Sequence, residues 1–426
     1  MPQIVAADHL PNLLAPGQSV FVQASTGEPA ELLAALAAAP EASRGVHYVG
    51  CLVPGINRTD PAAFHPEARL TTFFVQAELQ ASFAAGRVRF LPLHYSGISA
   101  YIKSLPPMDL ALIQVSPPDA EGMCSLGLSV DFVPMIFQAA KCIVAEVNRR
   151  MPALPGSPRV PYDALHYVVE CDRPLLELPT GGLPDTVATI GGRVAELIGD
   201  GDTIQIGIGK LPAAILSGLG DRRDLGLHGG MVTDEVAELV DVGALSGTRK
   251  SIDTGKMVCG AAIGTSRVFD WVVGRDDLLF RPADYTHNVP VIASIDNFVS
   301  INSVLEVDLT GQANAETMAG RQISGTGGLV DFVRGARMAN NGRSILALSA
   351  TAARGSISRI VPQLPAGAAV SCPRADIDYV VTEHGAARLK DKSVDERAEA
   401  LIAVADPAFR DELASQWTEL RRQMAG

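Results

Sequence analysis

The residues best suited to chemistry in this sequence lie in loops between apolar strand patterns and helix patterns. Gly207, Ile208, Gly209 and Lys210 follow such a strand and precede a helix that begins near Pro212. Glycines let a backbone approach a ligand closely, and the unpaired amides at a helix N-terminus attract negative charge. Lys210 adds a cation that would meet either a phosphate or solvent. The loop is a candidate anion site, although ordinary strand–helix turns also contain glycine.

A second glycine-rich loop lies later in the chain. Gly325, Gly327 and Gly328 belong to SGTGGLVDF (Ser324 to Phe332), which runs into another apolar-periodic stretch. Close approach of the backbone to a ligand and a simple tight turn both need glycine at such positions. The spacing alone leaves both interpretations open.

Two histidines stand beside glycines. His228 lies in LHGGM at the end of a predicted strand, and a lone histidine of this kind is more often structural than a base. Glu383 and His384 adjoin each other in VTEHGAARL, ahead of a glycine. An acid beside a histidine is a possible catalytic pair, but we favour a turn here.

Other catalytic signatures are missing from the sequence. It contains no GxSxG elbow, no HExxH and no phosphate-binding P-loop, and the dinucleotide pattern GxGxxG fails at Pro212. A nucleotide-dependent oxidoreductase is therefore disfavoured. The six cysteines form no CxxC and no metal-ligand spacing, so we predict reduced thiols and no metal: Cys51, Cys124, Cys142, Cys171, Cys259 and Cys372.

An internal repeat indicates which elements position these loops. The stretches that begin at Gly17 and Gly201 both read as a glycine turn, a short strand, a glycine-containing loop and Pro-Ala opening an amphipathic helix. Pro29 and Pro212 occupy the first helical turn, where proline is tolerated. A second strand ending in glycine follows each copy, in HYVGCLVPG and LGLHGGMVTD. The sequence therefore predicts two related open α/β domains with mostly parallel sheets.

The domain boundary is predicted in the Pro- and Gly-rich segment Pro174–Asp185. We expect an N-terminal domain over residues 1–180 and a C-terminal domain over residues 181–426. From Val394 onward the pattern is helical, and we interpret this end as a packing element without chemistry.

Composition limits the partners. The chain has 426 residues, 47% of them hydrophobic and 19% charged, with a net charge of -12. Nucleic acids and anionic membranes need a basic face, so neither is expected as a partner. The N-terminus lacks a basic segment followed by an apolar run, and no apolar stretch is long enough to span a bilayer. We expect a cytoplasmic protein.

Long motifs resemble those of a known family. DLALIQVSPPDAEGMCSLGLSVD (Asp109 to Asp131) resembles the hallmark of the N-terminal domain in the acetyl-CoA hydrolase/transferase family. Hallmarks of the C-terminal domain follow in family order: INSVLEVDLTGQANAE, SGTGGLVDFVRGA, TAARGSISRIVP and VTEHGAARL. The chain is identified as a member of this family, similar to family I CoA-transferases of the 4-hydroxybutyrate type.

The resemblance implies two α/β domains that face each other across the active site, in a homodimer. It implies acyl-CoA, with coenzyme A as the group carrier, and a small carboxylate as substrates. In this family a glutamate attacks the thioester, forms an acyl-glutamyl anhydride and then a glutamyl-CoA thioester. The loop from Gly207 to Lys210 would supply amides for the oxyanion. The loop with Gly325, Gly327 and Gly328 would lie along the pantetheine arm.

One position departs from the family. The family glutamate lies in a motif resembling GIHTEM followed by SDG, and the corresponding stretch here is GLHGGMVTDE. His228, Met231 and Asp234 keep the register, so Gly230 takes the place of the glutamate. Glycine has no side chain and cannot form the anhydride.

Three readings follow from Gly230. The protein hydrolyses the thioester or acts on another of its bonds without a covalent intermediate, with His228 or Glu235 as general base. Alternatively, it remains a carboxylate CoA-transferase that uses another carboxylate, from Glu235 or Glu383. The third reading is a non-catalytic acyl-CoA-binding protein. The sequence favours an enzyme over a binder and leaves the reaction open.

Overall fold

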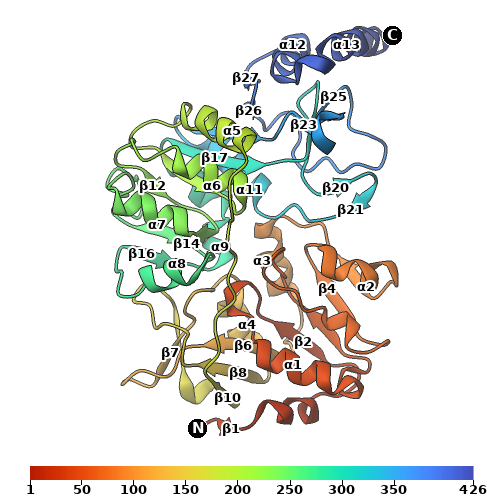
Figure 1. Cartoon of the computed structure of the whole chain (residues 1–426). Coiled ribbons are helices and arrows are strands. Elements are labelled where there is room, and N and C mark those ends of the chain that lie inside the picture. The colour runs from red at the N-terminus through yellow and green to blue at the C-terminus, as the bar shows by residue number, and fades with distance from the viewer. Residues whose placement is uncertain (426) are drawn as a thin grey trace. The chain divides into compact units, whose positions relative to one another are not determined.

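The computed structural model describes residues 1–425, which divide into two compact units (Figure 1). Unit 1 comprises Met1–Pro179, Met231–Asp234 and Val258–Thr286. Unit 2 comprises Thr180–Gly230, Glu235–Met257 and the chain from His287 onward. Neither unit is a single continuous segment, since two short pieces from the middle of the sequence fold with the N-terminal part.

Unit 1 is built on a parallel sheet with the strand order β1-β10-β8-β6-β2-β3-β4-β5. The long strands β6 and β8 are buried along their whole length, as expected for central parallel strands rich in Val, Ile and Leu. The strands are β1 (Gln3–Ile4), β2 (Ser19–Val22), β3 (His47–Val49), β4 (Arg69–Thr72), β5 (Val88–Phe90), β6 (Leu110–Val115), β8 (Ile143–Asn148) and β10 (Tyr167–Cys171).

Helices and short strands complete unit 1. Leu32, Leu33 and Leu36 bury the apolar face of α1 in the core that includes Val20 and Leu70. The helices are α1 (Ala30–Ala38), α2 (Gln80–Ala84), α3 (Tyr95–Ser104), α4 (Val133–Ala139), α8 (Ser266–Trp271) and α9 (Ala283–Thr286). Short pairs join β7 (Met123–Ser125) to β9 (Arg159–Pro161), β13 (Met231–Val232) to β15 (Ala261–Ala262), and β14 (Met257–Cys259) to β16 (Leu278–Phe280).

Unit 2 has a second sheet, in the order β12-β11-β17-β22-β26-β27. Its strands are parallel except for the edge strand β27, which pairs antiparallel with β26. The strands are β11 (Thr203–Ile206), β12 (Gly226–Leu227), β17 (Phe298–Ser303), β22 (Arg343–Ala347), β26 (Tyr379–Thr382) and β27 (Gly385–Arg388). Shorter strands are β18 (Glu306–Asp308), β19 (Ala313–Asn314), β20 (Thr317–Met318), β21 (Arg321–Gln322), β23 (Thr351–Ala352), β24 (Ile357–Ser358) and β25 (Ile360–Val361).

The helices of unit 2 pack on this sheet and on one another. α5 lies against α6, and α11 packs on β17 and β22. Leu401, Leu413 and Trp417 bury the C-terminal helices in one core, which confirms the helices predicted from Val394 onward. The helices are α5 (Asp185–Ala195), α6 (Lys210–Ser217), α7 (Asp234–Asp241), α10 (Val289–Ala293), α11 (Leu329–Met338), α12 (Val394–Val404) and α13 (Arg410–Ala425).

The predicted internal repeat is confirmed in the topology. β2 runs into α1 in unit 1, and β11 runs into α6 in unit 2. In each case the second predicted strand, β3 or β12, pairs parallel with the first. The order β8-β6-β2-β3 in one sheet matches β22-β17-β11-β12 in the other. Both halves are mostly parallel α/β folds, as the sequence predicts.

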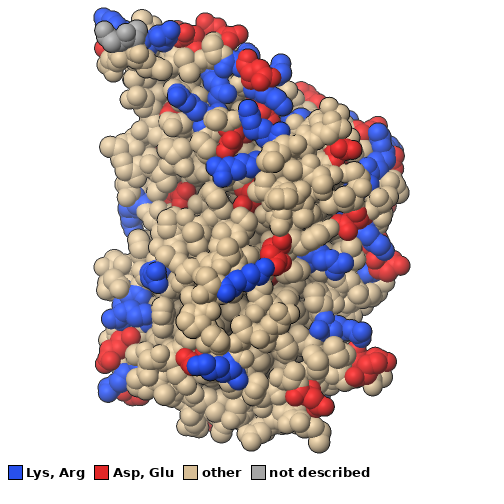
Figure 2. All heavy atoms as spheres, turned by 180° about the vertical axis from the view of Figure 1, so that it is seen from behind, with Lys and Arg blue, Asp and Glu red and all other residues tan. Residues whose placement is uncertain are grey.

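On the face drawn in Figure 2, basic and acidic side chains of the described residues are interspersed. The six cysteines all lie within residues 1–425, and each is a free thiol. None of the helices within this range is long and apolar enough to cross a membrane.

Candidate functional site

The loop from Gly207 to Lys210 has the predicted strand–loop–helix geometry. β11 ends at Ile206, and α6 begins at Lys210. Gly209 has φ 107° and ψ -176°, a backbone conformation that favours glycine. Gly209 and Lys210 are exposed, while Gly207 and Ile208 are half-buried. The loop therefore presents its backbone to solvent at the first turn of α6, where amides lack helical partners.

His228 is an interior residue. Its backbone amide donates to the carbonyl of Ile204 (3.1 Å), which continues the pairing of β12 with β11. The side chain is 0% exposed, and its ring lies edge-on to Phe298 with 6.3 Å between the ring centroids. A role as general base requires that a substrate or a water reach this interior position.

Gly230 faces another histidine, His287. A β-carbon built on Gly230 lies 3.3 Å from Cε1 and 3.4 Å from Nε2 of His287. Burial, and to a smaller extent the neighbouring His228, together lower the pKa of His287 to about 3. The imidazole is therefore neutral over the physiological pH range.

The same imidazole contacts the second glycine loop. A β-carbon on Gly328 would lie 2.4 Å from Cδ2 of His287, so only glycine fits beside the ring. Gly327 has φ +57°, and Gly325 is buried. α11 begins at Leu329, directly after this loop. His287 thus brings together two loops that the sequence marks separately, at Gly230 and at Gly328.

The other candidate acids have defined partners. Glu235 lies in the first turn of α7, half-buried, and accepts a hydrogen bond from the Thr180 hydroxyl (3.0 Å). Glu383 accepts from the backbone amide of Ala350 (2.8 Å) and, with His384, forms the connection between β26 and β27. The Glu383 side chain therefore has a structural partner in the segment between β22 and β23, and its role in ordering the turn stays a prediction.

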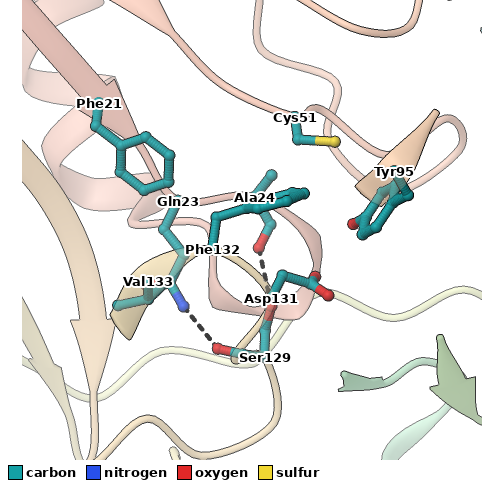
Figure 3. Close-up of a pocket in the computed structure, with 9 residues that line it drawn as sticks. All are labelled: Phe21, Gln23, Ala24, Cys51, Tyr95, Ser129, Asp131, Phe132 and Val133. Carbon is teal, nitrogen blue, oxygen red and sulfur yellow. Dashed lines mark hydrogen bonds between the residues drawn. The ribbon is translucent and has the colours of Figure 1, made fainter. Parts of the chain in front are cut away.

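Unit 1 contains a polar cluster at the carboxyl ends of β2 and β3. The hydroxyl of Tyr95 hydrogen-bonds with Cys51 and Asp131. These three side chains, drawn in Figure 3, are among those that line a small cavity. The cavity has a volume of about 10 Å³. Burial raises the pKa of Asp131 to about 7, although the hydrogen bond from Tyr95 opposes this. Burial also raises the pKa of the Cys51 thiol, so it is not a thiolate nucleophile. The cavity has room for about one water molecule.

A second buried group in unit 1 surrounds Asn57. Its side chain accepts from the backbone amide of Ser25 (2.8 Å) and hydrogen-bonds with the carboxyl of Glu28. Burial raises the pKa of Glu28 to about 7; Asn57 and Arg173 lower it, and Glu146 raises it. Among the described residues, Oε2 of Glu28 has no hydrogen-bond partner. Arg173 and Glu146 form a buried ion pair beside this group.

The sequence analysis did not single out His287 or Glu28. His287 lies in THNVP, a stretch with no motif, and only tertiary packing brings it to Gly230. Glu28 was detectable, because it stands before Pro29 where the repeat has Leu211 before Pro212. An acid at a position where the other copy of the repeat has a leucine indicates that polar partners surround this position in the fold. Within residues 1–425, no three His, Cys, Asp or Glu side chains come together as a metal-binding group.

These two parallel α/β units, with glycine loops at the strand ends of unit 2, are the fold of a CoA-thioester enzyme family. Residues 2–177 match the acetyl-CoA hydrolase/transferase N-terminal domain, and residues 264–417 match the C-terminal domain of the same family. The chain belongs to the acetyl-CoA hydrolase/transferase family, whose members are CoA-transferases and acetyl-CoA hydrolases.

The chain is similar over nearly its whole length to two proteins named as CoA transferases. It is 39% identical to the 4-hydroxybutyrate coenzyme A transferase of Clostridium kluyveri over 399 residues, covering 93% of each chain. It is 35% identical to the succinyl-CoA:cyclohexane-1-carboxylate CoA transferase of Geobacter metallireducens, covering 96% of this chain and 92% of the relative.

Solved structures agree with this assignment. RipA from Yersinia pestis superimposes with a TM-score of 0.92 at 32% identity, covering 98% of each chain. A 4-hydroxybutyrate CoA-transferase from Porphyromonas gingivalis gives a TM-score of 0.82 at 34% identity, covering 99% of this chain and 98% of that one.

Proposed function

We propose that this chain cleaves acyl-CoA thioesters by hydrolysis, without an acyl-glutamyl intermediate. The observation that carries the proposal is the absence of any carboxylate from Leu227 to Thr233, together with the position of Gly230 against the imidazole of His287. A covalent route of the family type needs a carboxylate nucleophile at this place, and neither glycine nor a neutral imidazole can form the anhydride.

The residues of unit 2 supply the other requirements of the reaction. Backbone amides between Gly207 and Lys210 would stabilise the oxyanion, and Gly325, Gly327 and Gly328 leave room for the pantetheine arm. Water attacks the thioester carbonyl, the C–S bond breaks, and CoA thiolate leaves as the free carboxylic acid forms. His228 or Glu235 would accept the proton of the attacking water.

The test is mass spectrometry of the purified protein with a panel of short-chain acyl-CoAs, with and without acetate. Free CoA released at the same rate in both conditions, with no acetyl-CoA, is the expected result. A mass-shifted acyl-CoA would instead indicate a reaction at another bond of the substrate. If the protein binds acyl-CoA but leaves it unchanged across the panel, the chain is a binder and the proposal fails.

A carboxylate CoA-transferase is the second candidate, because the two curated relatives described above are both named as transferases. This route needs a carboxylate from Glu235 or Glu383, or direct attack by the acceptor on the thioester. Acetyl-CoA that forms only when acetate is present would support transfer and exclude simple hydrolysis.

We expect acyl-CoA, with a small carboxylate as product or acceptor, and no nucleic-acid or membrane partner. We also expect a cytoplasmic location, and the resemblance to the family favours a homodimer. Size-exclusion chromatography with light scattering of the full chain measures the mass directly, and a monomeric mass at working concentration would contradict the dimer.

A further inference from the structure

The imidazole of His287 lies against two glycines, Gly230, where a β-carbon would fit tightly, and Gly328, where a β-carbon has no space. On one side, a β-carbon at Gly230 would stand 3.3 Å from Cε1. On the other side, a β-carbon at Gly328 would stand 2.4 Å from Cδ2 and 2.7 Å from Nε2. The ring edge that carries Nε2 therefore faces both loops of the candidate site.

The ring cannot easily move away. His287 is 4% exposed, and its ring packs on Phe332 with 4.7 Å between the centroids. Phe332 in turn stacks on Phe298, whose other neighbour is the ring of His228. A row of buried rings thus packs against the imidazole. Because protein interiors are close-packed, these rings resist displacement of the imidazole away from the two glycines.

The backbone at Gly230 does not itself demand glycine. Its φ lies outside the left-handed range in which side chains are strained. The obstacle to a larger residue there is the imidazole, since a contact of 3.3 Å to a β-carbon requires the neighbour to give way. Gly230 and His287 therefore form a matched pair in which the histidine occupies the space of the missing side chain.

We propose that His287 determines the reaction route of this enzyme by occupying the space in which a carboxylate nucleophile at position 230 would have to lie. The inference rests on the proposed function, because it concerns the route by which the thioester is opened. A glutamate placed at position 230 becomes a nucleophile only when residue 287 is also made smaller. His287 is thus a specificity-determining residue, because it decides whether water or a carboxylate of the protein acts as the nucleophile.

The covalent route has a defined mass signature. The glutamate carboxylate attacks the acyl-CoA carbonyl, the C–S bond breaks and CoA thiolate leaves, giving a mixed anhydride. The thiolate then attacks the glutamyl carbonyl, and the acyl group leaves as a free carboxylate. The protein finally carries a glutamyl-CoA thioester, which adds the mass of one CoA less one water.

The experiment compares Gly230→Glu, Gly230→Glu/His287→Ala and Gly230→Glu/His287→Asn with wild-type protein. Each full-length chain is incubated with short-chain acyl-CoA and analysed by intact-mass spectrometry, and acetyl-CoA formation from acetate is measured in parallel. Gly230→Glu/His384→Ala is the matched control, since His384 lies near Asp406 (3.6 Å) in the β26–β27 connection. Thermal unfolding reports whether each variant folds.

Both double variants at 287 should form the adduct and exceed Gly230→Glu in acetyl-CoA formation by at least about tenfold. Gly230→Glu and the His384 control should form little adduct. The inference would be overturned if Gly230→Glu alone formed as much adduct as the double variants at 287. It would also be overturned if a folded double variant formed no adduct. If neither double variant folds, His287 is a structural residue and the inference also fails. An adduct on wild-type protein would refute the proposed function alone, since the comparison among the variants still stands.

Discussion

Replacing the buried Glu28 by glutamine should make the protein more stable at alkaline pH. The Glu28 side chain is 3% exposed, and one carboxyl oxygen has no hydrogen-bond partner among the described residues. Burial raises its pKa to about 7, against the opposing effects of Asn57 and Arg173. The folded protein therefore holds the proton more tightly than the unfolded chain does.

The size of the effect follows from linkage. A rise of the pKa from 4.5 to about 7 corresponds to about 3 kcal/mol, at 1.36 kcal/mol for each tenfold change in proton affinity. Because the folded-state pKa is raised, this contribution is fully present below about pH 4.5 and is lost as the pH rises through about 7. Glu28→Gln keeps the shape of the side chain and removes the titration.

The assay is urea unfolding of wild type and Glu28→Gln across a pH series, followed by circular dichroism. The difference in unfolding free energy should be small near about pH 5 and should grow in favour of the variant, by up to about 3 kcal/mol, near about pH 8. Glu67→Gln is the control, since the Glu67 side chain is 62% exposed and should show little change. A difference for Glu28→Gln that stays constant with pH would refute the reasoning.

Three further substitutions test the packing and the chemistry. Gly328→Ala should destabilise the protein by about 1–3 kcal/mol in urea unfolding, because the added β-carbon has no space beside His287. Gly207→Ala is the control and should be tolerated, since its β-carbon would lie 4.0 Å from the nearest atom. Glu235→Gln should lower kcat for acyl-CoA hydrolysis by about 10²–10⁴ if Glu235 is the general base, while Thr180→Val, which removes only its hydrogen-bond donor, should cost far less. Arg173→Met should lower the unfolding free energy by about 3–5 kcal/mol, because it leaves the buried carboxylate of Glu146 without its cationic partner. A loss below about 1 kcal/mol would contradict this expectation.

Local patterns in the sequence predicted the repeating part of the fold well. The glycine turn, strand and Pro-Ala helix start from Gly17 and Gly201 correspond to β2–α1 and β11–α6. Such units are readable because each is set by neighbours along the chain: apolar periodicity, glycine in the turn and proline in the first helical turn.

The surroundings of the candidate site depend on contacts that are distant in sequence. Gly230 is recognisable as a departure from the family motif, but nothing near it indicates that His287 occupies the adjacent space. The buried carboxyl of Glu28 likewise acquires its pKa from Asn57, Arg173 and Glu146, which are far apart in sequence. These effects arise only when the chain is packed, so periodicity cannot report them.

The discontinuous units limit how such a gene can be recombined. The chain passes from one unit to the other at Pro179–Thr180, and returns for Met231–Asp234 and for Val258–Thr286. A chimera joined within Pro174–Asp185 would take the sheet of unit 1 from the parent that supplies the N-terminal half. It would take β13, β15 and β16, which fold with that unit, from the other parent. Sequence changes in these short segments must therefore remain compatible with the N-terminal half of the chain. The two halves consequently cannot evolve independently of each other.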